Sequence, residues 1–427
     1  MPATAFAQRR IARLASLPAV HRAFHWLHLH QPQLRQWQLE FVRIPAPTFH
    51  ESARADWFLD RFHQLGLTNI HLDPAGNALA ELSPRTLAPT PWPLNPSVPS
   101  APPPCLLLSA HLDTVFPLNT DVTPREDPDS PRIYAPGICD NAAGLSGLLA
   151  IAAALRYANI EPPVPILFAA NVGEEGQGDL RGMRQLFSQP PYKHRIAAAI
   201  ALEGSGNSAV VTRALGSLRF RVTLTGPGGH SWSDNDNPNP ILVLSQALTL
   251  LSERIPNTSL TSRTTFNVGC ITGGTSINSI PESASALLEI RSTHPERLRE
   301  AEAEMHSTIQ RVVSSFSQQH TTKGNLKTTM EAIGDRPAAA LPDDSPILHT
   351  LRAVDRHLTL RTDPRTGSTD ANIPLSLNIP AIAIGTGGTG GGIHTLQEWY
   401  DPTGRETALR RILLTLLDLA QTQQVQP

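Results

Sequence analysis

The sequence predicts an α/β fold, with a mostly parallel sheet and helices on both faces, interrupted by a smaller α+β domain. Two patterns support this prediction. Short, continuous apolar runs (CLLLSA, PILFAAN, IAAAIAL and PAIAIG) alternate with helical segments, as the buried strands of a parallel sheet do. Between about residues 214 and 332, strand-like segments instead alternate apolar and polar residues, which is typical of strands with one solvated face.

The N-terminal segment before the first buried strand is predicted to be mainly helical. Apolar residues recur at helical spacing within residues 1–45 and again over 52–65, where Gly66 ends the second segment. Short strands are expected near 69–72 and 78–82. The following stretch, 83–104, is so rich in proline that it predicts an extended surface loop, because proline supplies no backbone N–H and breaks helices.

The buried strands and their intervening helices define the larger domain. In chain order, the predicted elements are strand 105–110, helix 141–157, strands 165–171 and 196–202, helix 345–358, strand 380–385 and helix 405–420. Strands that alternate with helices in this way imply parallel pairing, because a helix connects each strand to the next.

The intervening segment predicts a different unit. Its elements are strand 218–225, helix 240–254, strands 264–271 and 284–291, helix 295–317 and strand 326–334. The order β-α-β-β-α-β is that of the ferredoxin-like split βαβ unit. Because the α/β pattern resumes afterwards, we predict one discontinuous domain of residues 1–213 and 333–427, and an inserted domain of residues 214–332.

Composition excludes several classes of protein. Among 427 residues, 35 basic side chains nearly balance 37 acidic ones, so the basic excess of a nucleic-acid-binding protein is missing. No apolar run reaches the length of about 20 residues that a membrane helix needs. Three cysteines without a CxxC pair, together with an N-terminus that lacks an apolar leader, predict a cytoplasmic protein with no nucleic-acid or membrane partner.

Polar residues cluster directly after the predicted buried strands. In open α/β sheets, ligands bind at the carboxyl ends of the strands. Mixed imidazole and carboxylate ligands suit Zn²⁺, and also Co²⁺ or Mn²⁺, and several packed carboxylates would repel one another without cations. The residues in question are His111, Asp113, Asp140, Glu174, Glu175, Glu203 and His394.

Two short motifs add detail to this metal hypothesis. His111 and Asp113 point the same way on an extended segment, so Asp113 can hydrogen-bond the second ring nitrogen of a metal-bound His111. Adjacent Glu174 and Glu175 point apart, so one can bind metal while the other acts as a general base. Taken singly, a His-x-Asp motif is often a cap or ion pair, and a Glu-Glu pair is often a solvated loop.

Two other enzymatic interpretations are disfavoured. The run GTGGTGGG resembles a phosphate-binding loop, but it lacks the GxGxxG spacing into a helix and no Lys-Ser pair follows it. No GxSxG motif appears at a strand-to-helix turn, so a serine hydrolase is not expected.

Eight segments carry a family resemblance: SAHLDTV, GICDNAAG, GEEGQGDLRG, ALEGSG, GPGGHSW, GGTSINSIPESASALLEIRS, TGSTDAN and GGGIHTLQEWYD. With them, the chain from about residue 36 to 420 resembles the zinc-dependent peptidase and amidohydrolase family that contains glutamate carboxypeptidase, peptidase T, aminoacylase and the acetylornithine and succinyl-diaminopimelate deacylases. The resemblance implies a zinc-exopeptidase-like fold with two Zn²⁺ per subunit, Co²⁺ or Mn²⁺ being possible. It also makes the inserted domain a lid and the contact of a homodimer.

The resemblance also implies individual roles. His111 and Glu203 would hold one metal, Glu175 and His394 the other, and Asp140 would bridge them. Glu174 would be the general base, and Asp113 would orient His111. The Asp140–Asn141 peptide bond is often cis in this family.

Residues of the inserted domain and of the C-terminal part receive roles by the same resemblance. His230 would enter the active site, commonly that of the partner subunit, and polarise the scissile carbonyl; a glycine turn with an exposed histidine is the plainer interpretation. Arg291 would hold a substrate carboxylate or else be a solvated charge at a strand end. The full set of positions implied to contact substrate is Asn278, Arg291, Ser368, Thr369 and Gly387.

The function implied is metal-dependent hydrolysis of a peptide or N-acyl amide bond at the end of a small peptide or acylated amino acid. Glu203 favours a carboxypeptidase or N-acyl-amino-acid deacylase, whereas residues 214–232 look closer to the peptidase T branch, so aminopeptidase and dipeptidase activities also stay open. A catalytically silent metal-binding homologue is the non-enzyme alternative.

Overall fold

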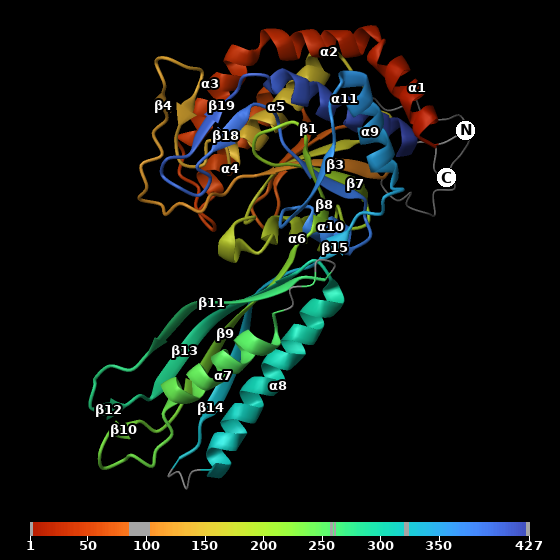
Figure 1. Cartoon of the computed structure of the whole chain (residues 1–427). Coiled ribbons are helices and arrows are strands. Elements are labelled where there is room, and N and C mark those ends of the chain that lie inside the picture. The colour runs from red at the N-terminus through yellow and green to blue at the C-terminus, as the bar shows by residue number, and fades with distance from the viewer. Residues whose placement is uncertain (1–2, 85–102, 257–258, 260–261, 320–323, 424–427) are drawn as a thin grey trace, which may run out of the picture. The chain divides into compact units, whose positions relative to one another are not determined.

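The computed structural model describes residues 3–84, 103–256, 259, 262–319 and 324–423. Most of the proline-rich stretch lies outside these residues. By its internal contacts the chain divides into two compact units (Figure 1). Unit 1 comprises Met1–Thr212 and Leu341–Pro427, and unit 2 comprises Arg213–Ala340.

The main sheet has the strand order β1-β2-β6-β3-β7-β17-β8-β15, with β16 paired to β8. Its four central strands, β6, β3, β7 and β17, run parallel, and the strands paired on either side of them run antiparallel. The mostly parallel sheet is thus confirmed at its centre. The bounds are β1 Thr68–Leu72, β2 Ala78–Leu82, β3 Cys105–His111, β6 Ile166–Asn171, β7 Ile196–Leu202, β8 Ala209–Ala214, β15 Ala339–Ala340, β16 Asp363–Gly367 and β17 Ala381–Ile384.

Helices cover this sheet above and below in the view of Figure 1, with α2, α5 and α11 above and α6 and α10 below. The N-terminal helical segment forms three separate helices. The bounds are α1 Ala3–Ala15, α2 Pro18–Leu29, α3 Gln31–Val42, α4 Ser52–Gln64, α5 Ala142–Tyr157, α6 Arg181–Ser188, α9 Pro346–Leu358, α10 Asn372–Ser376 and α11 Arg405–Gln423, with a short 3₁₀ turn, η1, at Gly176–Gly178. No helix among the described residues is both long and apolar enough to cross a membrane.

Helix α5 illustrates how small residues position the functional loops. Its first turn is capped by the Asn141 side chain, which accepts the Gly144 N–H at 3.1 Å and donates to the Leu202 carbonyl at 2.8 Å. A Cβ at Gly144 would lie 2.7 Å from that same carbonyl oxygen, so only glycine lets the helix approach the end of β7 this closely. The segments before α5 and after β7 are therefore held together.

A second, small sheet in unit 1 has the order β18-β19-β5-β4. Its strands are β4 Arg125–Glu126, β5 Ile133–Tyr134, β18 Thr389–Gly391 and β19 Trp399–Asp401. Part of the glycine-rich run therefore forms a strand, and the turn from β18 to β19 carries His394.

Unit 2 is a four-stranded antiparallel sheet, β11-β13-β9-β14, packed against α7 and α8. The element order β9, α7, β11, β13, α8, β14 is the one predicted. The bounds are β9 Gly216–Thr225, β10 Gly229–His230, α7 Pro240–Arg254, β11 Thr264–Gly273, β12 Ser279–Ile280, β13 Ser283–Ser292, α8 Pro295–Gln319 and β14 Lys327–Arg336. Strands β10 and β12 pair separately.

The second predicted domain boundary, 332/333, needs correction because it falls inside β14. The strand has an irregularity between Ala332 and Gly334 but stays paired with β9 as far as Arg336, which pairs with Ser217. Unit 2 accordingly ends at Ala340.

Candidate metal centre

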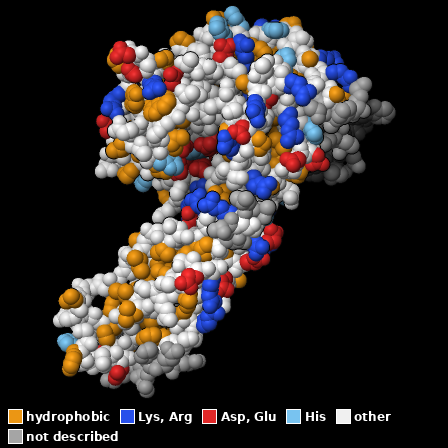
Figure 2. Space-filling view, in the orientation of Figure 1, with side chains coloured by type: hydrophobic (Ala, Val, Ile, Leu, Met, Phe, Trp, Pro, Cys, Tyr) orange, Lys and Arg blue, Asp and Glu red, His pale blue; other side chains and the backbone are white. Residues whose placement is uncertain are grey.

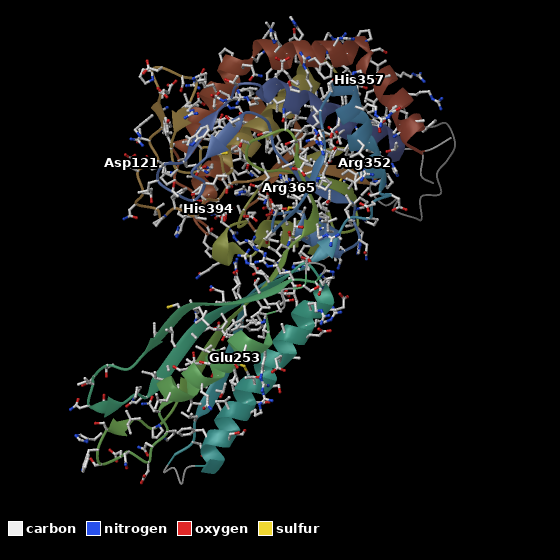
Figure 3. All side chains as sticks on the ribbon, viewed as in Figure 1. Asp121, Glu253, Arg352, His357, Arg365 and His394 are labelled. Carbon is white, nitrogen blue, oxygen red and sulfur yellow. The ribbon has the colours of Figure 1, made fainter. Side chains whose placement is uncertain are left out.

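Five potential metal ligands gather in unit 1: three end or follow parallel strands of the main sheet, one precedes α5 and one lies on the turn from β18 to β19. His111 ends β3, whose neighbours β6 and β7 run in the same direction, so the loops that follow these strands meet at one edge. Acidic side chains gather on this part of unit 1 (Figure 2), and His394 lies in the same unit (Figure 3). The five residues are His111, Asp140, Glu175, Glu203 and His394.

Asp140 is the shared member of two three-residue clusters. Its Oδ1 lies 3.1 Å from Nε2 of His111, which in turn lies 3.5 Å from Oε1 of Glu203. Its Oδ2 lies 3.1 Å from Nε2 of His394, which lies 3.0 Å from Oε1 of Glu175. Within each cluster the ligand atoms are all within 4.8 Å of one another. One carboxylate thus faces two imidazole–carboxylate pairs, one with each oxygen.

Burial and the crowding of carboxylates raise several pKa values in the site. Burial, together with the negative charges of Asp140 and Asp370, raises the pKa of Glu203 to about 7. Hydrogen bonds to Asp140 and Glu175 raise the pKa of His394 to about 10. Burial would lower the pKa of His111, but the surrounding carboxylates raise it well above its usual value.

Divalent cations would supply positive charge that offsets these carboxylates. Each cluster offers one imidazole nitrogen and oxygens from two carboxylates, a donor set that suits Zn²⁺, Co²⁺ or Mn²⁺. The residues therefore fit a pair of cations, with His111 and Glu203 on one side of Asp140 and Glu175 and His394 on the other.

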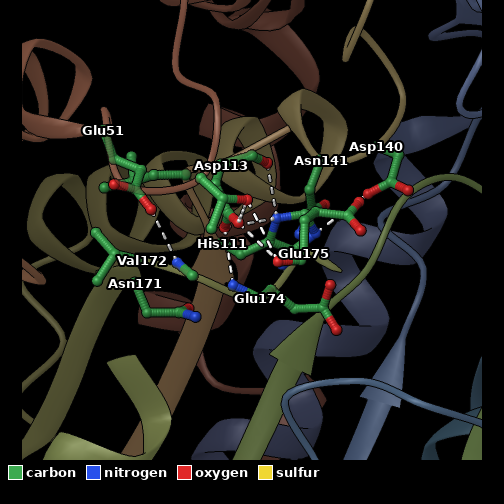
Figure 4. A network of polar contacts seen from close by, with 12 residues as sticks. Glu51, His111, Asp113, Asp140, Asn141, Asn171, Val172, Glu174 and Glu175 are labelled. Carbon is green, nitrogen blue, oxygen red and sulfur yellow. Dashed lines mark hydrogen bonds and ion pairs between the residues drawn. The ribbon is translucent and has the colours of Figure 1, made fainter. Parts of the chain in front are cut away.

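Asp113 holds the loop that follows β6 (Figure 4). Its Oδ1 and Oδ2 accept the backbone N–H groups of Glu174 and Glu175, each at 2.9 Å, and Oδ2 also accepts the Thr48 hydroxyl. Nδ1 of His111 lies 3.0 Å from the backbone oxygen of Asp113 and 3.5 Å from its Oδ1. Orientation of His111 is thus shared between the backbone and the carboxylate of Asp113, and the same carboxylate also fixes the two glutamates.

Glu174 lies beside the ligands. Its side chain is buried, and one of its carboxylate oxygens lies within 4.8 Å of ligand atoms of both His111 and Glu175. Glu174 therefore lies near one residue of each cluster, His111 and Glu175. The Asp140–Asn141 peptide bond, which is next to the shared ligand, is cis.

The substrate positions predicted in unit 1 differ from one another in burial and in hydrogen bonding. Thr369 is buried and its hydroxyl accepts the Ala371 N–H, while neighbouring Ser368 is half-buried. The N–H of Gly387 donates to the Gly206 carbonyl at 2.8 Å, and a Cβ there would lie 2.7 Å from Cα of Arg405. Gly387 thus packs the loop against α11 and uses its backbone donor within the protein.

The remaining predicted positions belong to unit 2. His230, on β10, is exposed, and its Nδ1 accepts the Trp232 N–H at 3.2 Å. Asn278 accepts the Ser276 hydroxyl. Arg291 donates from Nε and Nη2 to the Glu289 carboxylate, at 2.7 and 2.9 Å, so its guanidinium is held in place by a neighbour on the same strand.

Sequence reasoning did not single out three buried acidic residues around the centre. Asp370 accepts from Nδ2 of Asn171, whose strand position pairs with His111. Glu51 accepts the Gly173 N–H at 3.1 Å and is paired with Arg181. Glu398 accepts three N–H groups of the segment that carries Asp140. Of these three, only Asp370 and Glu398 could have been found from the sequence, because both lie inside segments that carry the family resemblance.

The fold and the donor set define a candidate two-metal centre of the kind found in co-catalytic hydrolases. The sequence profile of peptidase family M20/M25/M40 matches residues 107–421, so the chain belongs to this family.

Individual relatives and solved structures are also similar to this chain. A probable carboxypeptidase from Ajellomyces dermatitidis is 30% identical over 207 residues, which are 45% of this chain and 46% of that protein. The chain thus matches about half the length of such relatives. A tripeptidase from Staphylococcus aureus superposes with a TM-score of 0.70 at 21% identity, covering 91% of this chain and 98% of the other. A dinuclear metal-binding M20 peptidase from Bacillus subtilis gives 0.62 at 14% identity, covering 92% and 98%.

The Glu289 pair yields a pH-dependent prediction. Burial would raise the pKa of Glu289, but hydrogen bonds from Arg291 and Arg219 lower it to about 2. A depressed folded-state pKa stabilises the protein above the unfolded value of about 4.3, and the effect is lost as pH falls towards 2. We expect E289Q to lower the unfolding free energy by about 1 kcal/mol at pH 7, a value discounted for partial solvent screening, and by much less at pH 2.5.

Urea unfolding at both pH values measures this difference. E331Q is the matched control, because Glu331 forms an exposed ion pair with Arg221 in the same sheet and should change stability little at either pH. An equal effect of E289Q at both pH values would contradict the assignment.

Proposed function

We propose that this chain is a metal-dependent hydrolase that cleaves a peptide or N-acyl amide bond at the end of a small peptide or acylated amino acid. The observation that carries the proposal is Asp140, whose two oxygens face two separate imidazole–carboxylate pairs. A pair of Zn²⁺ ions bound there, or Co²⁺ or Mn²⁺, would lower the pKa of a water molecule and polarise the scissile carbonyl.

In this proposal, Glu174 is the general base. It accepts the proton of the attacking water and returns it to the leaving amine. Its burial beside His111 and Glu175 supports the role, as does the hydrogen bond that fixes its backbone to Asp113. Asp113 keeps both His111 and the Glu174–Glu175 pair in place, so that base and ligands keep a constant spacing.

Two substrate classes remain in the proposal. Family relatives include a probable carboxypeptidase, and similar structures include a tripeptidase, which supports an exopeptidase. Glu203 favours a carboxypeptidase or an N-acyl-amino-acid deacylase. In either case Arg291, oriented by Glu289, would bind a substrate carboxylate, with Asn278, Ser368 and Thr369 as further contacts.

Replacing Glu174 by Gln tests the general base. We expect kcat to fall by a factor of about 10²–10⁴, because the amide cannot accept the proton, while metal content stays at two ions per subunit. Activity is measured on the best substrate from a library of short peptides and N-acyl amino acids, and metal content by elemental analysis.

E81Q is the control for this experiment. It also neutralises a buried carboxylate, but Glu81 pairs with Leu167 near the start of β6, at the end of the strand remote from the site. Substantial activity in E174Q would reject Glu174 as the base. Two bound metals without cleavage of any library member by the unmodified protein would instead favour the catalytically silent alternative.

We also propose that the chain forms a homodimer through unit 2. Strand β11 lies at the edge of the sheet, contains no charged residue and exposes Val268 and Ile271. An unprotected edge of this kind favours pairing with a strand of another chain. With such pairing, His230 of one subunit would enter the partner's active site and polarise the carbonyl, as the family resemblance implies.

Charged substitutions on β11 test the dimer. We expect V268K/I271K to sediment as a monomer at concentrations where the unmodified protein sediments as a dimer, because lysine on an edge strand opposes strand pairing. T329K places a lysine on β14, the opposite edge, and should leave the dimer intact. A V268K/I271K protein that remains dimeric would exclude β11 as the contact.

A further inference from the structure

We infer that Glu398 is a positioning residue for the metal centre: its buried carboxylate holds the backbone turn that presents Asp140 to both cations. This inference rests on the proposed function, because it assigns Glu398 a task only if Asp140 binds metal. Glu398 lies four residues after His394 in the chain and immediately before β19.

Three short hydrogen bonds carry the inference. Oε2 of Glu398 accepts the Gly137 N–H at 2.9 Å, and Oε1 accepts the Cys139 and Asp140 N–H groups, each at 2.8 Å. The Glu398 backbone oxygen also accepts the Ala135 N–H at 3.1 Å. One residue thus binds the turn on both sides and contacts the backbone of the shared ligand directly.

The partners of the Glu398 carboxylate are the backbone N–H groups of the turn rather than a charged neighbour. The side chain is fully buried, and in the described part of the chain no arginine, lysine or histidine lies within ion-pair distance of it. Burying a carboxylate without a cation costs free energy, which three charge-assisted N–H bonds offset. An apolar side chain could fill the same space, but it would leave the three N–H groups without these acceptors.

Asp140 links this clamp, the three hydrogen bonds to Glu398, to the proposed metal positions. Asp140 directs one oxygen towards His111 and the other towards His394, so a small rotation of its backbone would misplace both oxygens together. Asp113 provides a parallel case in the same site, because its two oxygens hold the N–H groups of Glu174 and Glu175. A single segment, 394–398, then supplies one ligand and fixes another, which ties the spacing of the two metal positions together.

Metal affinity of E398Q is the direct test. Glutamine has the same shape, but one oxygen becomes an NH₂ donor, so in either orientation at least one N–H of the turn faces a donor instead of an acceptor. We expect both Zn²⁺ ions to bind about 10–100-fold more weakly, as removal of groups that orient metal ligands does. Competition with a chromophoric chelator measures both dissociation constants. E81Q, the matched Glu→Gln control, should stay within threefold of the unmodified protein.

The outcomes distinguish failure of the proposed function from failure of the inference about Glu398. If the unmodified protein binds none of Zn²⁺, Co²⁺ and Mn²⁺, the proposed function fails. If it binds two ions and folded E398Q binds them within threefold, the inference about Glu398 fails alone. A loss of thermal stability without a change in metal affinity would mark Glu398 as structural and likewise overturn the inference.

A second measurement uses the unmodified protein and covers the case that E398Q does not fold. Amide hydrogen exchange of the metal-free protein should show the N–H groups of Gly137, Cys139 and Asp140 protected, because the clamp exists before metal binds. Rapid exchange of these amides in the metal-free state would overturn the inference.

Discussion

The two imidazoles that face the single carboxylate of Asp140 are the interaction on which the rest of this structure depends. Several acidic side chains gather around them, and each added negative charge makes the gathering less favourable in the absence of cations. The pKa values of Glu203 and His394 are both raised, so that the carboxyl of Glu203 keeps its proton more readily and the imidazole of His394 gains one more readily. Divalent cations remove both demands at once.

The parallel sheet makes this concentration of charge possible. Its central strands deliver their carboxyl ends to one edge, so His111, Glu175 and Glu203 become neighbours although they end or follow three different strands. Backbone groups then keep the ligand loops in place. Asp113, Glu51 and Glu398 each accept N–H groups from a segment that carries ligands, so the site rests on fixed backbone rather than on side-chain contacts alone.

The sequence made the strand-end residues predictable because apolar runs of the parallel type mark the ends of strands, and the family resemblance supplied their roles. The sequence could not supply the contacts between residues that lie far apart in the chain. Glu398 has no pattern that distinguishes it from a solvated carboxylate, since its partners lie about 260 residues away. The backbone N–H of Gly387, a predicted substrate position, donates to Gly206, a contact that no local pattern in the sequence indicates. The boundary at 332/333 was placed inside the predicted strand 326–334, whereas the strand runs to Arg336 and unit 2 to Ala340.

Stability alone does not account for so many buried carboxylates. Replacing buried charged groups by well-packed apolar residues is often neutral or stabilising, so a fold selected only for stability would not place Asp113, Glu174, Glu175 and Glu398 together under cover. Positions that break the local rules of burial are expected where function requires them. Other buried carboxylates of unit 1, such as Glu81, Asp355 and Asp418, lie elsewhere and are paired with arginines. Asp113 and Glu398 instead hold the backbone of segments that carry ligands, and Glu174 and Glu175 belong to the ligand clusters.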